Sequence, residues 1–129
     1  MGAYKIANLK ELENSAERFG LAPNLEARFA RSALEAEKSG LSYQRLAPSF
    51  RGPFGHRHEQ QEETYVVVSG SGRVKLEDEV CELRQWDAVR VAPRTARAFE
   101  AGPDGLELLV FGAGASGDAE TLADWWPAE

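Results

Sequence analysis

The sequence has 129 residues, 43% of them hydrophobic, and its 15 basic and 21 acidic side chains give a net charge of −6 at pH 7. This length and composition predict one domain with a hydrophobic core. The acidic balance argues against a nucleic-acid partner, and no apolar run is long enough for a membrane span or a signal peptide. A single cysteine, Cys81, excludes an internal disulfide and is predicted to pack as a small hydrophobic residue, so we expect a cytoplasmic protein with no membrane partner.

Residues 1–40 have the least regular pattern, and we interpret them as an N-terminal arm. Residues 9–19 predict a frayed helix or an extended segment. Residues 25–31 alternate as a strand does, and residues 33–38 predict a turn or two of helix. We expect this arm to pack on the rest of the domain or on a partner subunit.

From residue 41 onward, short apolar segments alternate with turn residues. Strands are predicted over residues 41–47, 73–77, 80–83, 88–92, 97–100 and 106–111, and the glycine-rich segments 69–72 and 102–105 predict tight turns. Strands at intervals of about ten residues with no helix between them predict an all-β antiparallel barrel or sandwich. We place its core at residues 41–112.

Residues 113–129 are predicted to be a C-terminal tail with a short helix over residues 118–124. Residues 112–117 satisfy the pattern G-x-G-x-x-G, but no βαβ unit surrounds them, so we interpret them as a linker and not as a dinucleotide site. Trp125 and Trp126 are expected to cover the open side of the barrel or a subunit contact.

The only two histidines, His56 and His58, are separated by one residue. On a helix these side chains would point about 200° apart, whereas on a strand they leave the same face and can bind one ion. Residues 64–68 are β-branched or aromatic, which predicts a strand after the polar connection at residues 59–62. The segment is therefore predicted to be strand, polar turn, strand.

Glu63 opens the second of these strands and is the carboxylate expected beside His56 and His58. An unbroken strand would instead bring Glu62 to the histidine face, so Glu62 is the substitute. Two imidazoles and one carboxylate are a common ligand set for Fe, Mn, Ni, Co or Zn. The sequence therefore predicts a site for one divalent transition metal ion.

The pattern His-x-His, four residues, Glu63, six residues, Gly70 resembles the first motif of the cupin superfamily. The glycine that usually precedes the first histidine by six positions is replaced by Phe50. The resemblance covers about residues 41–112 and implies a cupin-like double-stranded β-helix, a jelly-roll-type antiparallel barrel. It also implies a homodimer, in which the arm adds a strand to the partner.

Residues 86–99 resemble the second cupin motif, with departures. Trp86 and Arg94 stand where glycines are usual, and Arg97 stands where the family has a histidine as fourth metal ligand. The permanent charge of Arg97 would repel a cation and attract Glu63. This departure leaves three functional hypotheses open.

The first hypothesis is a small metal-dependent enzyme of the oxygenase or isomerase type, acting on a small-molecule substrate. Arg97, Tyr65 and Gln44 are its candidate substrate contacts, and the substrate would be anionic if Arg97 binds it. The second is a non-catalytic barrel that binds a small molecule. The third is a metal-free structural barrel, in which an ion pair between Arg97 and Glu63 replaces the metal. Core packing is the alternative role for Tyr65 and Gln44, and it is the role expected for Phe99.

Overall fold

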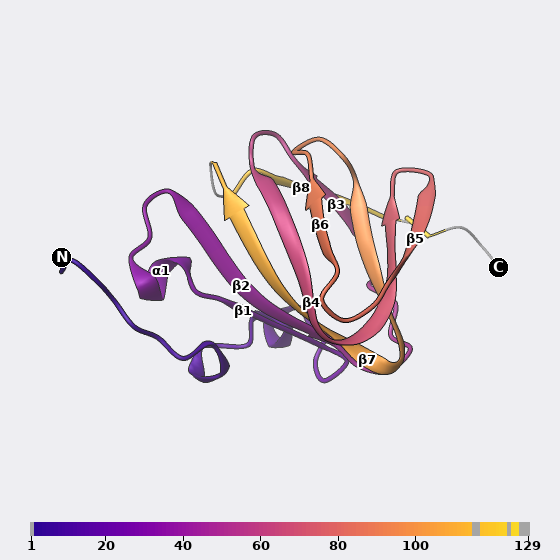
Figure 1. The fold of residues 1–129 in the computed structure, drawn as a ribbon, viewed down its shortest axis with the longest axis horizontal. Coiled ribbons are helices and arrows are strands. Elements are labelled where there is room, and N and C mark those ends of the chain that lie inside the picture. The colour runs from indigo at the N-terminus through magenta and orange to yellow at the C-terminus, as the bar shows by residue number, and fades with distance from the viewer. Residues whose placement is uncertain (1, 115–116, 124, 127–129) are drawn as a thin grey trace.

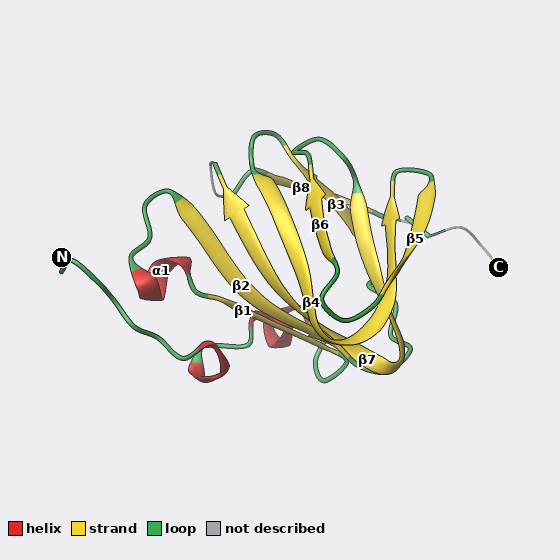
Figure 2. Cartoon of the chain, in the orientation of Figure 1, coloured by secondary structure: helices red, strands yellow, loops and turns green. Residues whose placement is uncertain are grey.

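The computed structural model describes residues 2–114, 117–123 and 125–126. Their strands belong to one antiparallel sheet that curls around a common interior (Figure 1). Helical segments lie only in the N-terminal part of the described chain, and none is long and apolar enough to span a membrane (Figure 2). The predicted fold class, an all-β antiparallel barrel with a short irregular or helical N-terminal segment, is confirmed.

The elements follow one another in a simple order. The helical segments are the 3-10 helices η1 Leu9–Glu11 and η2 Ser15–Phe19 and the α-helix α1 Arg31–Leu34. The strands are β1 Leu25–Phe29, β2 Ser39–Leu46, β3 Gly55–His58, β4 Glu62–Leu76, β5 Glu79–Leu83, β6 Ala88–Val91, β7 Arg97–Ala113 and β8 Ala119–Leu122.

Two long strands, β4 and β7, run through both layers of the barrel. The C-terminal half of β7 pairs with β2 and with the first half of β4, and β1 and β6 extend this layer. The N-terminal half of β7 pairs with the second half of β4 and with β3, and β5 and β8 extend that layer. The two strands therefore connect the layer that carries the histidines to the layer that faces it.

The two glycine-rich segments that predict tight turns lie inside β4 and β7, so the predicted strand ends there are wrong. Gly70 pairs with Leu106 but Gly72 pairs with Ala101, which marks a bulge where the strands pass from one layer to the other. Gly70 has φ +80°, and a Cβ at this position would lie 2.0 Å from the carbonyl oxygen of Gly105. Glycine serves a bulge as well as a turn, so composition alone does not separate the two.

The core lies between the layers and is built from alternate residues of the strands. Tyr65 and Val67 of β4 point inward, and the rings of Tyr65 and Phe99 have their centroids 4.6 Å apart. The buried cluster consists of Leu46, Tyr65, Val67, Val74, Leu83, Val91, Phe99, Ala101, Leu106, Leu108 and Val110. Burial of each large apolar side chain stabilises the fold by about 1.5–3 kcal/mol.

The N-terminal arm differs in detail from its predicted elements. The segment 9–19 forms η1 and η2, whose first turns are capped by the side chains of Asn8 and Asn14. β1 lies within the predicted strand and pairs with β2, and α1 begins two residues before the predicted helix. Tyr4 and Ile6 are 83% and 87% exposed. Figure 1 shows the N-terminus beyond α1, away from the barrel.

The helix predicted over residues 118–124 is wrong, because Ala119–Leu122 form β8 antiparallel to β3. The carboxylate of Asp118 accepts hydrogen bonds from the backbone N–H groups of Gln60 and Gln61, at 2.7 and 3.1 Å. These bonds hold the tail beside the end of β3. The free edge of β3 then pairs with β8, which satisfies backbone groups that a local helix would leave open.

Trp125 and Trp126 pack on the segment that leads into β3. The ring of Trp125 lies against Gly55, where a Cβ would come within 2.6 Å of its Cγ, and Lys75 Nζ lies 3.6 Å from the ring centroid. Trp126 Nε1 donates to the carbonyl oxygen of Gly52 at 3.0 Å. Both indoles therefore cover the layer that carries the histidines.

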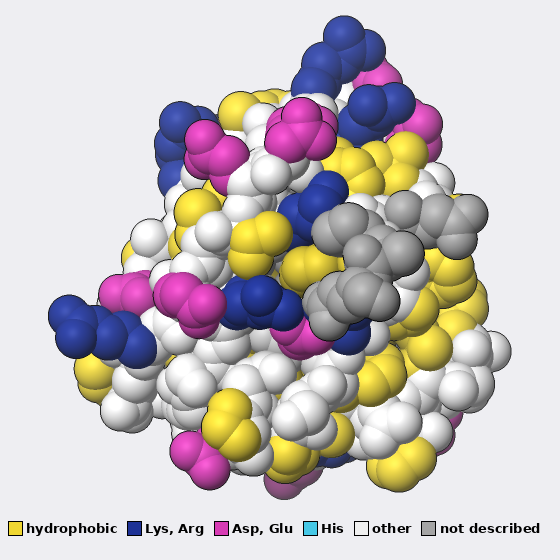
Figure 3. Space-filling view, turned by 90° about the vertical axis from the view of Figure 1, so that its right-hand side faces the viewer, with side chains coloured by type: hydrophobic (Ala, Val, Ile, Leu, Met, Phe, Trp, Pro, Cys, Tyr) yellow, Lys and Arg dark blue, Asp and Glu magenta, His cyan; other side chains and the backbone are white. Residues whose placement is uncertain are grey.

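Charges of both signs are mixed on the face of the molecule opposite the N-terminal arm, which Figure 3 shows. Basic and acidic side chains are interspersed there with apolar ones. Ion pairs such as Arg51–Glu100 and Arg73–Glu100 bring opposite charges together on the surface. No continuous basic patch is visible on this face.

Candidate metal centre

β3 directs both histidines into the interior of the barrel. His56 lies opposite Arg97 of β7 and opposite Thr121 of β8 in the strand register. The rings of His56 and His58 are 5.2 Å apart between centroids and nearly perpendicular. The side chain of His58 is 8% exposed and that of His56 is 35% exposed, so the pair lies where the interior opens to solvent.

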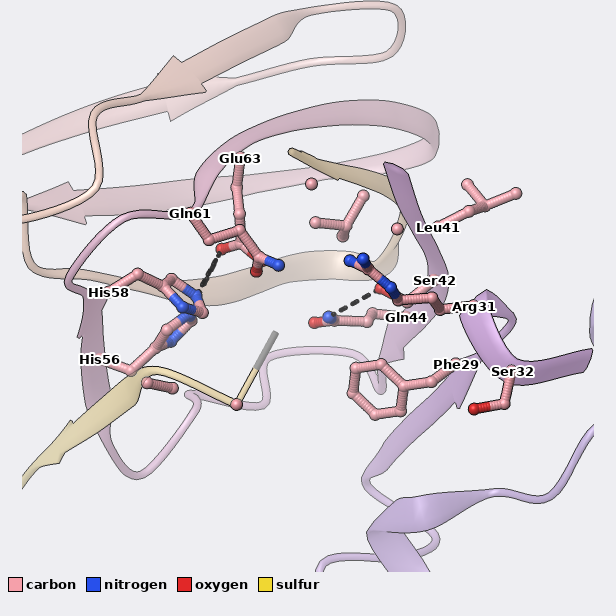
Figure 4. Close-up of a pocket in the computed structure, with 15 residues that line it drawn as sticks. Phe29, Arg31, Ser32, Leu41, Ser42, Gln44, His56, His58, Gln61 and Glu63 are labelled. Atoms are coloured by element: carbon pink, nitrogen blue, oxygen red, sulfur yellow. Dashed lines mark hydrogen bonds and ion pairs between the residues drawn. The ribbon is translucent and has the colours of Figure 1, made fainter. Parts of the chain in front are cut away.

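Glu63, the second residue of β4, completes the group. Its Oε1 lies 3.4 Å from Nε2 of His56 and 3.3 Å from Nε2 of His58 (Figure 4). Nitrogen and carboxylate ligand atoms of the three residues all lie within 4.8 Å of one another. Glu62, the substitute carboxylate, is exposed and pairs with Arg90 at 3.1 Å. The structure therefore brings Glu63, and not Glu62, to the histidines.

Tyr65, two residues further along β4, is buried and contacts the Glu63 carboxylate. Its hydroxyl donates to Glu63 Oε1 at 2.5 Å. Burial and the nearby Glu63 charge raise the pKa of Tyr65 well above 10, so the hydroxyl keeps its proton. Burial alone would raise the pKa of Glu63, but hydrogen bonds to His56 and Tyr65 and the charges of both histidines lower it. Glu63 is therefore ionised and oriented.

Asp118 also belongs to the site, although the sequence did not single it out. Its Oδ1 lies 2.8 Å from Nδ1 of His58, while Oδ2 accepts the backbone N–H groups of Gln60 and Gln61. The hydrogen bond from Gln60 is the largest cause of a strong lowering of the pKa of Asp118, and burial only partly opposes it. In a neutral imidazole this arrangement puts the proton on Nδ1 and leaves the lone pair on Nε2.

The three residues fit a metal ion. Nε2 of His58 is buried and has no hydrogen-bond partner, although Glu63 Oε1 is near. A buried polar atom without a partner costs about 1–3 kcal/mol, and a cation would satisfy this one. Metal-binding histidines commonly donate their other ring N–H to a carboxylate, as His58 can donate to Asp118.

Arg97, at the expected position of a fourth ligand, is fully buried opposite His56. Its Nη2 donates to the carbonyl oxygen of Ala92 at 3.3 Å, and its Nε and Nη1 have no hydrogen-bond partner. Among the described residues no ion pair joins Arg97 to Glu63, so the pair suggested to replace the metal is not formed. The Arg97 charge acts on Tyr65 instead, where it opposes the rise in pKa.

A cavity of about 450 Å³ opens beside the three residues (Figure 4). Gln44, a predicted substrate contact, lines it, whereas Tyr65 and Arg97 do not belong to its lining. Sequence reasoning missed Arg31 and Gln61, which also line the cavity. The full lining is Phe29, Arg31, Ser32, Gly40, Leu41, Ser42, Gln44, His56, His58, Gln61, Glu63, Val110, Gly112, Gly117 and Ala119.

The fold and this site define a class of protein: an antiparallel β-barrel that gathers two histidines and a glutamate beside a cavity open to solvent. The family model of the cupin domain matches residues 42–112, which is more than half of the chain. The chain therefore belongs to the cupin family, as its first motif predicted. A search of curated proteins finds no significant match.

Solved structures share the fold. A cupin protein from Bacteroides fragilis is 24% identical, with 91% of this chain and 89% of that chain covered and a TM-score of 0.72. KdgF from Halomonas sp. is 20% identical, with 90% and 97% covered and a TM-score of 0.66. A salicylate 1,2-dioxygenase mutant from Pseudoaminobacter salicylatoxidans, in complex with gentisate, is 16% identical, with 85% and 33% covered and a TM-score of 0.66. At these identities the likeness shows the fold alone.

Proposed function

We propose that this cupin binds one divalent transition metal ion through His56, His58 and Glu63 and is a small metal-dependent enzyme of the oxygenase or isomerase type. The observation that carries the proposal is the buried, unpartnered Nε2 of His58, whose Nδ1 is held by Asp118. Fe, Mn, Ni, Co and Zn all accept this ligand set. When bound, such an ion supplies Lewis acidity that polarises an oxygen of the substrate.

The protein's own residues have distinct roles in this proposal. Asp118 fixes the orientation of His58, and Tyr65 fixes that of Glu63. The adjoining cavity is large enough for a small substrate, since ligand sites commonly have volumes of roughly 300–1,000 Å³. The side-chain amide of Gln44 offers a donor and an acceptor to a substrate there.

Two features support an enzyme in particular. Only three protein ligands are proposed, and catalytic metal sites characteristically keep a position for substrate or water. The dioxygenase with the same fold agrees with this proposal, although its likeness extends only to the fold.

A second candidate is a non-catalytic cupin that binds a small molecule in the same cavity. The burial of Arg97 at the position of the usual fourth ligand favours it, because a permanent cation near the site weakens the binding of a metal ion. The two candidates differ in whether the purified protein holds a stoichiometric metal.

The test is metal analysis of protein purified without chelators or a metal-affinity tag. We expect about one transition metal ion per chain, lost in His58→Ala. The matched control is Arg57→Ala: this residue lies between the histidines on the other face of β3 and pairs with Glu120. Wild-type protein that takes up none of the five metals after incubation with each would contradict the proposal.

A further inference from the structure

The cavity holds a cation that no carboxylate of the described residues neutralises. Arg31, the first residue of α1, lines the cavity together with His56, His58 and Glu63. Its Nη2 donates to the carbonyl oxygen of Glu37 at 2.8 Å, which anchors the guanidinium. Its Nη1 is buried without a hydrogen-bond partner, and the described residues offer it no ion pair. A buried cationic N–H without an acceptor is costly, so a bound anion would stabilise this arrangement.

Arg31 and the histidines lie on opposite sides of the cavity. Figure 4 shows the Arg31 guanidinium reaching inward from the side of α1 and β2, across from His56 and His58. Gln44 lies between them and donates to Ser42 Oγ at 3.4 Å. A molecule in the cavity can therefore contact Arg31 at one end and the metal-binding group at the other.

The remaining walls restrict the body of such a molecule. Phe29 and Val110 line the cavity with apolar side chains, whereas the Leu41 side chain points away from it in Figure 4. Among the described lining residues the one acid, Glu63, already accepts a hydrogen bond from Tyr65 and lies against both histidines. Arg31 is thus the charge that a ligand of opposite sign can complement, and the apolar walls favour a hydrocarbon body.

We propose that Arg31 binds the carboxylate of a small organic acid whose apolar body packs along Phe29 and Val110. In this assignment Arg31, and not Arg97, selects an anionic ligand. A contact between the other end of the acid and a metal ion rests on the proposed function. The contact between the carboxylate and Arg31 does not depend on a metal.

The test measures binding of phenylacetate, 3-phenylpropionate, 4-phenylbutyrate and hexanoate to the full chain by isothermal titration calorimetry. We expect at least one acid to bind, with the matching neutral amide about tenfold weaker or more. Arg31→Gln should lower the affinity for the acid by about tenfold or more. Arg31→Lys keeps the charge and should lower this affinity less. Arg84→Gln, which removes an exposed arginine without a described ion pair, should change nothing.

Thermal unfolding of each variant shows whether it is folded, and Arg31→Lys provides the comparison if Arg31→Gln is not. Equal affinity of wild type and Arg31→Gln, equal affinity for acid and amide, or no binding of any acid would overturn the assignment. Titration of His58→Ala separates the two proposals. An acid that still binds this metal-free variant through Arg31 keeps the assignment of Arg31 even if the metal proposal fails.

Discussion

His58 and Asp118 are sixty residues apart in the chain, yet Nδ1 of one lies 2.8 Å from Oδ1 of the other. The contact exists because β8 pairs with β3, and it orients the imidazole whose Nε2 faces Glu63. It therefore couples the position of the C-terminal segment to the geometry of the candidate metal centre.

Removal of the Asp118 carboxylate should weaken metal binding. We expect Asp118→Ala to lower the affinity for Co²⁺ or Zn²⁺ by about 10–100-fold, because His58 loses the group that orients its ring. A competition titration with a chromophoric chelator measures the affinity. Glu120→Ala is the control, since it removes an exposed acid only two residues further along the chain, in β8. Equal affinities of Asp118→Ala and wild type would show that the hydrogen bond does not orient a ligand.

The Tyr65 hydroxyl should matter separately from its ring. Tyr65→Phe keeps the contact with Phe99 but removes the hydroxyl that donates to Glu63, so we expect a loss of about 1–2 kcal/mol in the free energy of unfolding and weaker metal binding. Urea denaturation and the same metal titration measure both effects. Tyr43→Phe removes a similar hydrogen bond to Glu107, away from the site, and should leave the metal affinity unchanged. If both variants bind metal like wild type, Tyr65 has no role in orienting Glu63.

Glu26 should contribute to acid sensitivity. Burial tends to raise its pKa, but hydrogen bonds from Arg28 and Arg45 outweigh it and hold the pKa below the ordinary value of 4.5. A carboxyl whose pKa is lower in the folded state stabilises the fold above its unfolded pKa, and this stabilisation is lost as the pH falls through the folded pKa. The free energy of unfolding should therefore fall less steeply below about pH 4.5 in Glu26→Gln than in wild type. Parallel curves for the two proteins would contradict this.

Two glycines with similar backbone angles should differ in their tolerance of a side chain. Gly70 and Gly20 have φ of +80° and +70°, but only Gly70 faces an obstacle, the carbonyl oxygen of Gly105. Gly20→Ala should cost about 1–2 kcal/mol from backbone strain alone. Gly70→Ala should cost clearly more, because the bulge must open to admit the methyl group. Thermal unfolding compares the variants, and equal losses would argue against close contact between β4 and β7 at the bulge.

The sequence identifies the central residues of the site because their positions depend on local rules. Alternation along a strand places His56 and His58 on one face. The polar connection after them interrupts the strand, so that Glu63 and not Glu62 faces the histidines. Asp118 was missed because its role depends on the pairing of β8 with β3. That pairing is a long-range contact, and local composition suggested a helix instead. Arg31 was missed for the same reason, since an irregular arm gives no sign of the cavity that it borders.

The sequence predicts the fold class, but it does not predict that β4 and β7 are continuous strands. Regular spacing of short apolar segments indicated an antiparallel barrel, and the structure has one. The glycines of β4 and β7 were read as hairpin turns, although they bend two continuous strands. The homodimer, the cytoplasmic location and the absence of a nucleic-acid partner stay predictions.

The most direct test of the metal site is the anomalous scattering of crystals grown with Zn²⁺ or Co²⁺ and measured on both sides of the absorption edge of that metal. We expect one strong peak within about 2.0–2.2 Å of the Nε2 atoms of His56 and His58 and of a Glu63 carboxylate oxygen. Well-diffracting crystals with no peak there, and with Glu63 still lying between the two imidazoles, would contradict it.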